Sequence, residues 1–135
     1  MGISEHRKNL THARRIVVKI GSRVLVQKTG RPDTTRMKAL VKDIARLRRE
    51  GREVVVVSSG AIGTGVHALG LKTRPTSLPD LQMAAAVGQS RLMTTYDKLF
   101  AAEKCKIGQV LLTHDDLNNR QRHLNARNTM MALLR

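Results

Sequence analysis

Residues 54–65 read Val-Val-Val-Val-Ser-Ser-Gly-Ala-Ile-Gly-Thr-Gly. The four consecutive valines are typical of a strand that is covered on both faces of a sheet. The small and hydroxyl-bearing residues that follow them indicate a sharp turn into a short helix. This stretch therefore predicts a buried strand that ends in a polar, glycine-rich loop.

The sequence before this stretch predicts one further strand and one helix. Residues 16–20, Ile-Val-Val-Lys-Ile, form a β-branched run of strand type. Residues 24–26 either continue this strand or pair with it. Apolar residues at helical spacing then predict a helix that Asp33 or Thr34 caps and Gly51 ends.

The sequence after the quoted stretch predicts a long helix, a third strand and a last helix. A loop over residues 72–76 leads to residues 77–80, Ser-Leu-Pro-Asp, which resemble a capping box with proline in the first turn. The apolar run over residues 107–112 predicts the third strand. Asn118 or Asn119 is expected to cap the last helix.

Predicted strands and helices thus alternate along the chain. Such alternation is typical of a parallel sheet with right-handed crossovers and helices on both faces. The length fits one domain, and no linker-like stretch divides it. The fold class that we predict is α/β, a three-layer αβα sandwich with a mainly parallel sheet.

The charge balance is strongly basic. The 135 residues include 25 Lys and Arg against 10 Asp and Glu, which gives a formal net charge of +15. A surplus of this size favours anionic partners, so a basic module that binds nucleic acid is one interpretation. Aromatic residues make up only 1% of the chain, whereas sequence-tolerant nucleic-acid binders pair a basic groove with stacking aromatic side chains. A nucleic-acid partner is therefore not the interpretation that we favour.

Cysteine content and hydropathy point to a cellular compartment. The chain has a single cysteine, Cys105, which excludes an intrachain disulfide framework and fits a reducing compartment. No apolar run is long enough to cross a membrane. Residues 1–13 are a polar, basic leader without the apolar core of a secretory signal. We therefore predict a cytoplasmic protein without a membrane partner.

Residues suited to anion binding gather where the predicted strands end. Lys19-Ile20-Gly21-Ser22 closes the first strand, and Ser59-Gly60-Ala61 follows the second. Ligands of parallel sheets bind beyond the carboxyl ends of the strands, where glycines let backbone N–H groups approach an anion. A lysine at such an end can stabilise a transferring phosphoryl group. Each element alone is also compatible with an ordinary structural role, a tight turn for the glycines and a sheet-edge position for Lys19.

No metal site is predicted. The five histidines and Cys105 lack the spacing of metal ligands. Asp115 and Asp116 could bind a metal, but helix capping is the interpretation that we favour for them.

Five short motifs in this order resemble the amino acid kinase family. They are VVKIGS at residues 17–22, VSSGA at 57–61, AVGQSRLM at 86–93, GQVLLT at 108–113 and LNARNT at 124–129. The first two motifs are shared with members that phosphorylate acetylglutamate or aspartate. The last three are most similar to members that phosphorylate glutamate.

The resemblance implies a reaction and its cofactors. The reaction is ATP-dependent phosphorylation of the γ-carboxylate of L-glutamate to γ-glutamyl phosphate, the first step of proline biosynthesis, with ATP and Mg²⁺ as cofactors. Carried over by position, Lys19 stabilises the transferring phosphoryl group, and Gly21 and Ser22 line the phosphate loop. Because the carboxylate is itself the nucleophile, catalysis is expected to consist of positioning and electrostatic stabilisation.

The resemblance also implies substrate-binding residues and partners. Ser59, with the backbone of Gly60 and Ala61, is expected to hold L-glutamate, and Asn128 is expected to lie near it. A homo-oligomer and feedback inhibition by proline are implied in the same way.

The resemblance covers residues 14–135, the N-terminal half of the family's domain, so an incomplete domain is expected. The family's Glu-Asn-Asp substrate motif and nucleotide-binding half would follow beyond this range, and the 135 residues alone are expected to be inactive. Arg23 stands where the family usually has a small residue. Two alternatives stay open: a family member acting on acetylglutamate or aspartate, and a nucleic-acid-binding module without kinase activity.

Overall fold

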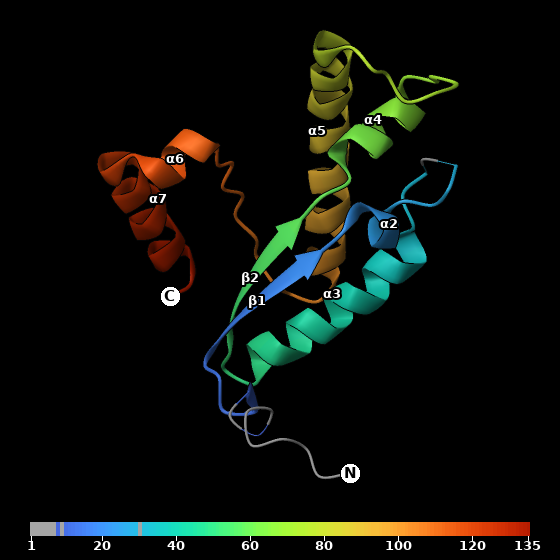
Figure 1. The fold of residues 1–135 in the computed structure, drawn as a ribbon. Helices are drawn as coiled ribbons and strands as arrows, with labels where there is room; N and C mark the ends of the chain where they lie inside the picture. Colours follow the sequence, from blue (N-terminus) through green and yellow to red (C-terminus); the bar gives the residue numbers. More distant parts are fainter. Residues whose placement is uncertain (1–7, 9, 30) are drawn as a thin grey trace. The chain divides into compact units, whose positions relative to one another are not determined.

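The computed structural model describes residues 8, 10–29 and 31–135. Its elements are, in chain order, β1 (Arg15–Ile20), α2 (Ser22–Leu25), α3 (Thr34–Arg49), β2 (Glu53–Ser58), α4 (Ala61–Ala68), α5 (Leu78–Ala102), α6 (His114–Asn118) and α7 (Arg120–Leu133) (Figure 1). The chain forms two compact units, Met1–Cys105 and Lys106–Arg135, and each is described by itself. The predicted α/β class is confirmed.

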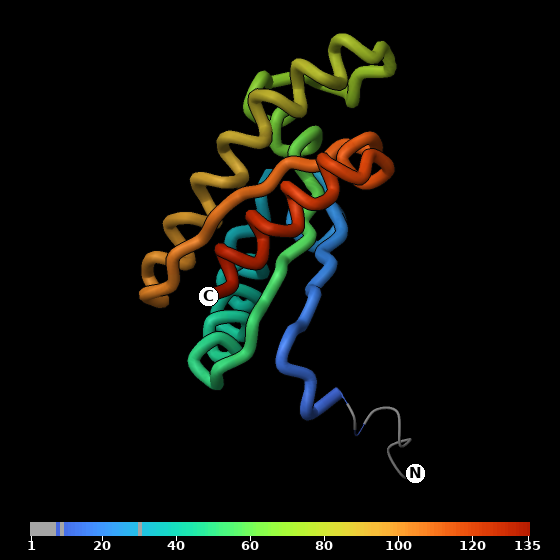
Figure 2. Tube along the Cα trace, turned by 90° about the vertical axis from the view of Figure 1, so that its left-hand side faces the viewer, coloured from blue at the N-terminus to red at the C-terminus, as the bar shows by residue number. Residues whose placement is uncertain are grey.

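The first unit contains a parallel sheet formed by β1 and β2, which run side by side in both views (Figures 1 and 2). Arg15 pairs with Glu53, and the register continues without a shift to Ile20 and Ser58. An ion pair of 2.7 Å between Arg15 and Glu53 closes the starting end of the ladder. Because the strands are parallel and in register, their carboxyl ends meet at one edge of the sheet.

The two faces of this sheet differ. Burial alternates along β1, and Ile20 is only 4% exposed on the face that the helices cover. Val17 and Val57 lie on the opposite face and are 63% and 48% exposed. Within the described part of the first unit, helices therefore supply one of the two layers expected beside the sheet.

Helix α3 forms where its capping signals predict. The side chain of Asp33 accepts a hydrogen bond from the backbone N–H of Arg36 at 3.1 Å. Gly51, with φ of 83°, lets the chain reverse after the helix. The buried face of α3 consists of Met37, Val41, Ile44 and Ala45. The predicted helix is confirmed at both ends.

Helices α4 and α5 cross in backbone contact (Figure 2). The cap of α5 is the predicted one, because Ser77 accepts from the backbone N–H of Asp80 at 3.3 Å. A Cβ atom added to Gly88 of α5 would lie 1.7 Å from the carbonyl oxygen of Ala61. A Cβ atom added to Gly65 would lie equally close to the oxygen of Ala84. The crossing thus requires glycine on both helices.

The second unit consists of a short irregular segment followed by α6 and α7. Thr113 and Asp116 form a capping box at the start of α6. Asn119, rather than Asn118, caps α7 by accepting from the backbone N–H of Arg122 at 3.1 Å. The capping interpretation of Asp116 is confirmed.

The prediction of a third strand over residues 107–112 is wrong. This segment has no regular structure and, within the part of the chain that the structure describes, no ladder partner. An apolar run indicates suitability for a sheet, but a strand also needs a neighbour to supply its hydrogen bonds. Leu111 is 72% exposed, and Gly108 lies against the side chain of Leu133 on α7.

The segment after β1 also differs from expectation. Residues 24–26 neither continue β1 nor pair with it, because Ser22–Leu25 form the single turn α2. Leu25 is fully buried and packs toward α3, which favours the turn over a strand. Val26 then forms an isolated antiparallel bridge with Pro32.

Residues 1–7 and 9 of the predicted leader lie outside the described residues. Arg52 donates hydrogen bonds to the carbonyl oxygens of Thr11 and Ala13, just before β1. Among the described residues, no helix combines the length and the apolar character that a membrane crossing requires.

Candidate functional site

Most of the predicted site residues meet at the shared carboxyl edge of β1 and β2. Lys19 lies opposite Val57 in the ladder, one position before β1 ends. Gly21 and Ser22 follow β1, and Ser59 follows β2. We call the segments 19–22 and 59–61 the strand-end site.

Direct hydrogen bonds join the two segments of the strand-end site. The backbone N–H of Ser59 donates to the carbonyl oxygen of Ile20 at 3.2 Å. The Ser59 hydroxyl donates to the same oxygen at 3.3 Å. Its oxygen lone pairs remain available to accept a hydrogen bond, for example from an α-amino group. The position of Ser59 is therefore set by the end of the neighbouring strand.

Two glycines of this site differ in their surroundings. Gly60 has φ of 108°, and a Cβ atom there would lie 3.2 Å from Cγ2 of Val26, so the fold itself requires glycine. Gly21 has φ of −75°, and an added Cβ atom would meet nothing within 4 Å. The fold does not require glycine at position 21, and the space beside its backbone is open to a ligand.

The start of α4 can also face an anion. Gly60 is the N-cap of α4 and provides no side chain to bond the first backbone N–H groups. Unpaired N–H groups and the positive end of the helix dipole favour negatively charged ligands. By contrast, α2 is a single turn of four residues, so the helix-dipole contribution expected there is small.

The charge of Lys19 is not neutralised by the described part of the protein. Lys19 is exposed and forms no ion pair with any described residue. Arginines near the end of α3 do have partners: Arg49 lies 3.3 Å from Glu103, and Arg46 lies 3.7 Å from Asp43. Lys19 can therefore interact with an anion that reaches the strand ends.

One residue near the site was not predicted from the sequence. The hydroxyl of Tyr96 on α5 lies 2.9 Å from Oγ of Ser58, directly before Ser59. Burial raises the pKa of Tyr96, and its hydrogen bond with Ser58 partly opposes the shift. Nothing in the sequence indicated which strand this tyrosine would meet.

Two further predicted features take no part in these hydrogen bonds. Asn128 is exposed on α7, in the second unit, so its place beside the substrate stays a prediction. Arg23, in α2, is exposed next to the strand-end site and adds positive charge there.

The described residues contain no group of three or more His, Cys, Asp or Glu side chains that could hold a metal ion. Mg²⁺ in phosphoryl-transfer sites is commonly held by substrate phosphates with few protein ligands. An exposed lysine and an open glycine backbone suit such phosphates. The strand-end site therefore fits the triphosphate group of a nucleotide that carries Mg²⁺.

Known proteins resemble this chain over nearly its whole length. Residues 14–135 match the model of the amino acid kinase family. The chain is 48% identical over 131 residues to the glutamate 5-kinase of Moorella thermoacetica, covering 97% of this chain and 35% of that protein. It is 52% identical over 121 residues to the glutamate 5-kinase of Pelobacter propionicus, covering 90% and 32%.

A third relative is similar to the same extent. The glutamate 5-kinase of Thioalkalivibrio sulfidiphilus is 48% identical over 132 residues, which is 98% of this chain and 35% of that protein. The chain thus spans about a third of the length of the curated relatives it matches. The resemblance inferred from the five motifs is confirmed.

Proposed function

Because this chain belongs to the amino acid kinase family, we propose that it forms the phosphate loop and part of the glutamate pocket of a glutamate 5-kinase. ATP with Mg²⁺ supplies the phosphoryl group, which the γ-carboxylate of L-glutamate accepts to give γ-glutamyl phosphate and ADP. This reaction begins proline biosynthesis.

One observation supports the proposal above the others. The in-register parallel pairing of β1 and β2 brings Lys19 and Gly21 to the same edge as Ser59. In the proposed reaction, Lys19 stabilises the negative charge on the transferring phosphoryl group. The open backbone at Gly21 and Ser22 lies along the phosphates.

The glutamate pocket includes Ser59 and the uncapped start of α4. The hydroxyl of Ser59 and the backbone N–H groups at Gly60 and Ala61 hold the amino acid. Asn128, by its position in the LNARNT motif, is a further candidate substrate-binding residue. Since the γ-carboxylate is already a nucleophile, these residues need only orient it.

The remaining properties follow from the same family assignment. We propose a cytoplasmic enzyme that forms a homo-oligomer and is inhibited by proline. The nucleic-acid alternative is not favoured, because several basic residues that suggested it have partners within the fold. Arg49 pairs with Glu103, and Arg52 binds backbone carbonyl groups.

The decisive assay measures ATP-dependent acyl phosphate formation by the protein that carries this chain. Glutamate, N-acetylglutamate and aspartate are offered separately, and the product is trapped with hydroxylamine. We expect turnover with glutamate. Turnover with only one of the other two acids would contradict the substrate assignment.

A glycine variant tests the phosphate loop in the same assay. Gly21→Ala adds a methyl group that meets no atom of the protein within 4 Å, so stability should be retained. The methyl group would instead occupy space beside the phosphates, and we expect the KM for ATP to rise about tenfold or more, as for a lost charge-assisted hydrogen bond. An unchanged KM would show that phosphates do not approach Gly21.

A further inference from the structure

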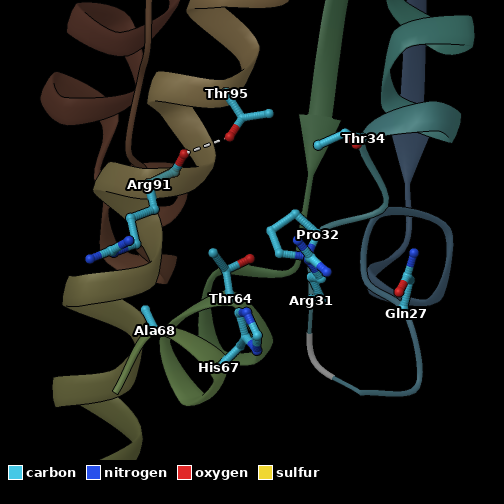
Figure 3. Close-up of a pocket in the computed structure, with 9 residues that line it drawn as sticks. All are labelled: Gln27, Arg31, Pro32, Thr34, Thr64, His67, Ala68, Arg91 and Thr95. Atoms are coloured by element: carbon cyan, nitrogen blue, oxygen red, sulfur yellow. Dashed lines mark hydrogen bonds between the residues drawn. The ribbon is translucent and has the colours of Figure 1, made fainter. Parts of the chain in front are cut away.

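A cavity of about 400 Å³ lies in the first unit, between the loop that joins α2 to α3 and the helices α4 and α5 (Figure 3). Its volume is within the range of small-molecule sites. None of the residues of the strand-end site lines it. The lining residues that matter for its chemistry are Arg31, Pro32, Thr64, His67, Ala68 and Arg91.

The lining of this cavity is basic. Arg31, His67 and Arg91 contribute to its walls, and no acidic side chain is among the lining residues. Neither arginine forms an ion pair with any residue that the structure describes. Guanidinium groups without a counter-charge beside a cavity attract carboxylate and phosphate groups, which they can bind through paired hydrogen bonds.

A buried hydroxyl in the same cavity lacks a partner. Thr64 is 2% exposed, and its Oγ1 atom forms no hydrogen bond with the described residues. Three other helical threonines, Thr94, Thr95 and Thr129, bond the carbonyl group four residues back, as Thr95 does with Arg91 at 3.0 Å. Figure 3 shows the Thr64 hydroxyl turned toward Pro32 and Arg31, with its methyl group on the side of α5.

The loop that carries Arg31 is held in place. The backbone N–H of Gln27 donates to the carbonyl oxygen of Arg31 at 2.8 Å, and Val26 forms a bridge with Pro32. Arg31 therefore extends from a closed loop rather than from a free one. Pro32 and Ala68 add a small apolar surface to the wall.

We propose that this cavity binds a small oxyanion, a metabolite with a carboxylate or phosphoryl group, beside Arg31, with Arg91 as a second cationic residue on the α5 wall. The Thr64 hydroxyl donates to the same anion. The apolar surface at Pro32 and Ala68 accommodates a short carbon skeleton. This second site is separate from the strand-end site, and its existence does not depend on the kinase assignment.

Titration calorimetry at low ionic strength tests the site, with inorganic phosphate and succinate as probes. Saturable binding of either probe is expected, and the probe that binds more tightly identifies the anionic group. Arg31→Gln and Arg91→Gln should each raise the Kd about tenfold or more, as for loss of a charge-assisted pair. Thr64→Val, which keeps the shape, should raise it about fivefold, as for one hydrogen bond.

Two control variants distinguish binding in this cavity from general charge attraction and from binding at the strand ends. Arg46→Gln makes the same charge change at an exposed position near the far end of α3 and should leave the Kd unchanged. Lys19→Ala removes the lysine of the strand-end site and should also leave it unchanged. The proposal is overturned if neither probe binds, or if Arg46→Gln weakens the affinity as much as the cavity variants do. It is also overturned if only Lys19→Ala weakens the affinity, which would assign the anion to the strand-end site.

Discussion

From the close crossing of α4 and α5 we predict how much Gly88→Ala lowers the free energy of unfolding. The added Cβ atom would lie 1.7 Å from the carbonyl oxygen of Ala61 and 2.5 Å from the backbone nitrogen of Gly65. A carbon and a carbonyl oxygen ordinarily approach to about 3.3 Å. The two helices would have to separate by roughly 1.5 Å, and no side chain can yield instead, because both neighbouring atoms belong to the backbone.

The size of the effect follows from two opposing contributions. Overpacking a core typically costs about 1–3 kcal/mol, and contact with backbone favours the upper end of that range. Alanine is a better helix former than glycine by about 1 kcal/mol, which offsets part of the cost. The expected net loss is about 2 kcal/mol of unfolding free energy, or a urea midpoint lower by about 1 M at a typical slope.

Urea unfolding monitored by circular dichroism measures this loss, and Gly21→Ala is the matched control. The control makes the same chemical change where an added methyl group has no neighbour, so its midpoint should stay the same or rise slightly. If Gly88→Ala unfolds at the same urea concentration as the unsubstituted protein, the backbone contact between α4 and α5 is not as described.

Three further predictions concern the proposed active site and the second unit. Lys19→Ala should lower kcat about 100-fold or more with little change in the KM for glutamate, whereas the exposed control Lys38→Ala should leave kcat unchanged. An unchanged kcat of Lys19→Ala in steady-state assays would make Lys19 an ordinary lysine at the edge of the sheet. Ser59→Ala should raise the KM for glutamate and leave that for ATP nearly unchanged, and a parallel rise in both would place Ser59 in another subsite. Hydrogen bonds from the backbone and side chain of Thr113 lower the pKa of Asp116. The cap of α6 should therefore stay formed at pH values above the usual range of aspartate pKa values and be lost as the pH falls through the lowered pKa. An NMR titration of the Thr113 amide with a midpoint at or above the usual aspartate pKa range would refute this prediction.

Local signals in the sequence predicted where the longer helices α3, α5 and α7 begin. Asp33, Ser77 and Asn119 all cap helices in the structure, because a cap depends on hydrogen bonds to residues two or three positions away. The strand ends were predicted for a similar reason. A β-branched run followed by Ser59 and Gly60 specifies where extended backbone must stop.

Contacts between distant residues were not predictable in the same way. The run over 107–112 has strand composition, but composition does not say whether a neighbouring strand is present to pair with it. Neither the bond between Tyr96 and Ser58 nor the unpartnered hydroxyl of Thr64 follows from spacing. Both depend on how α5 and α4 pack on their surroundings, which only the three-dimensional structure shows.

The in-register pairing of β1 and β2 has a consequence for how the chain folds. Arg15 meets Glu53 across a sequence separation of 38 residues, and each pair in the ladder has the same offset. Closing so long a loop carries an entropic cost before any ladder bond forms, but α3 shortens the loop by making its 16 residues a compact rod. During synthesis, β1 therefore has no partner in the ladder until the ribosome has added the residues of β2. The helix between them is the element whose early formation speeds their meeting.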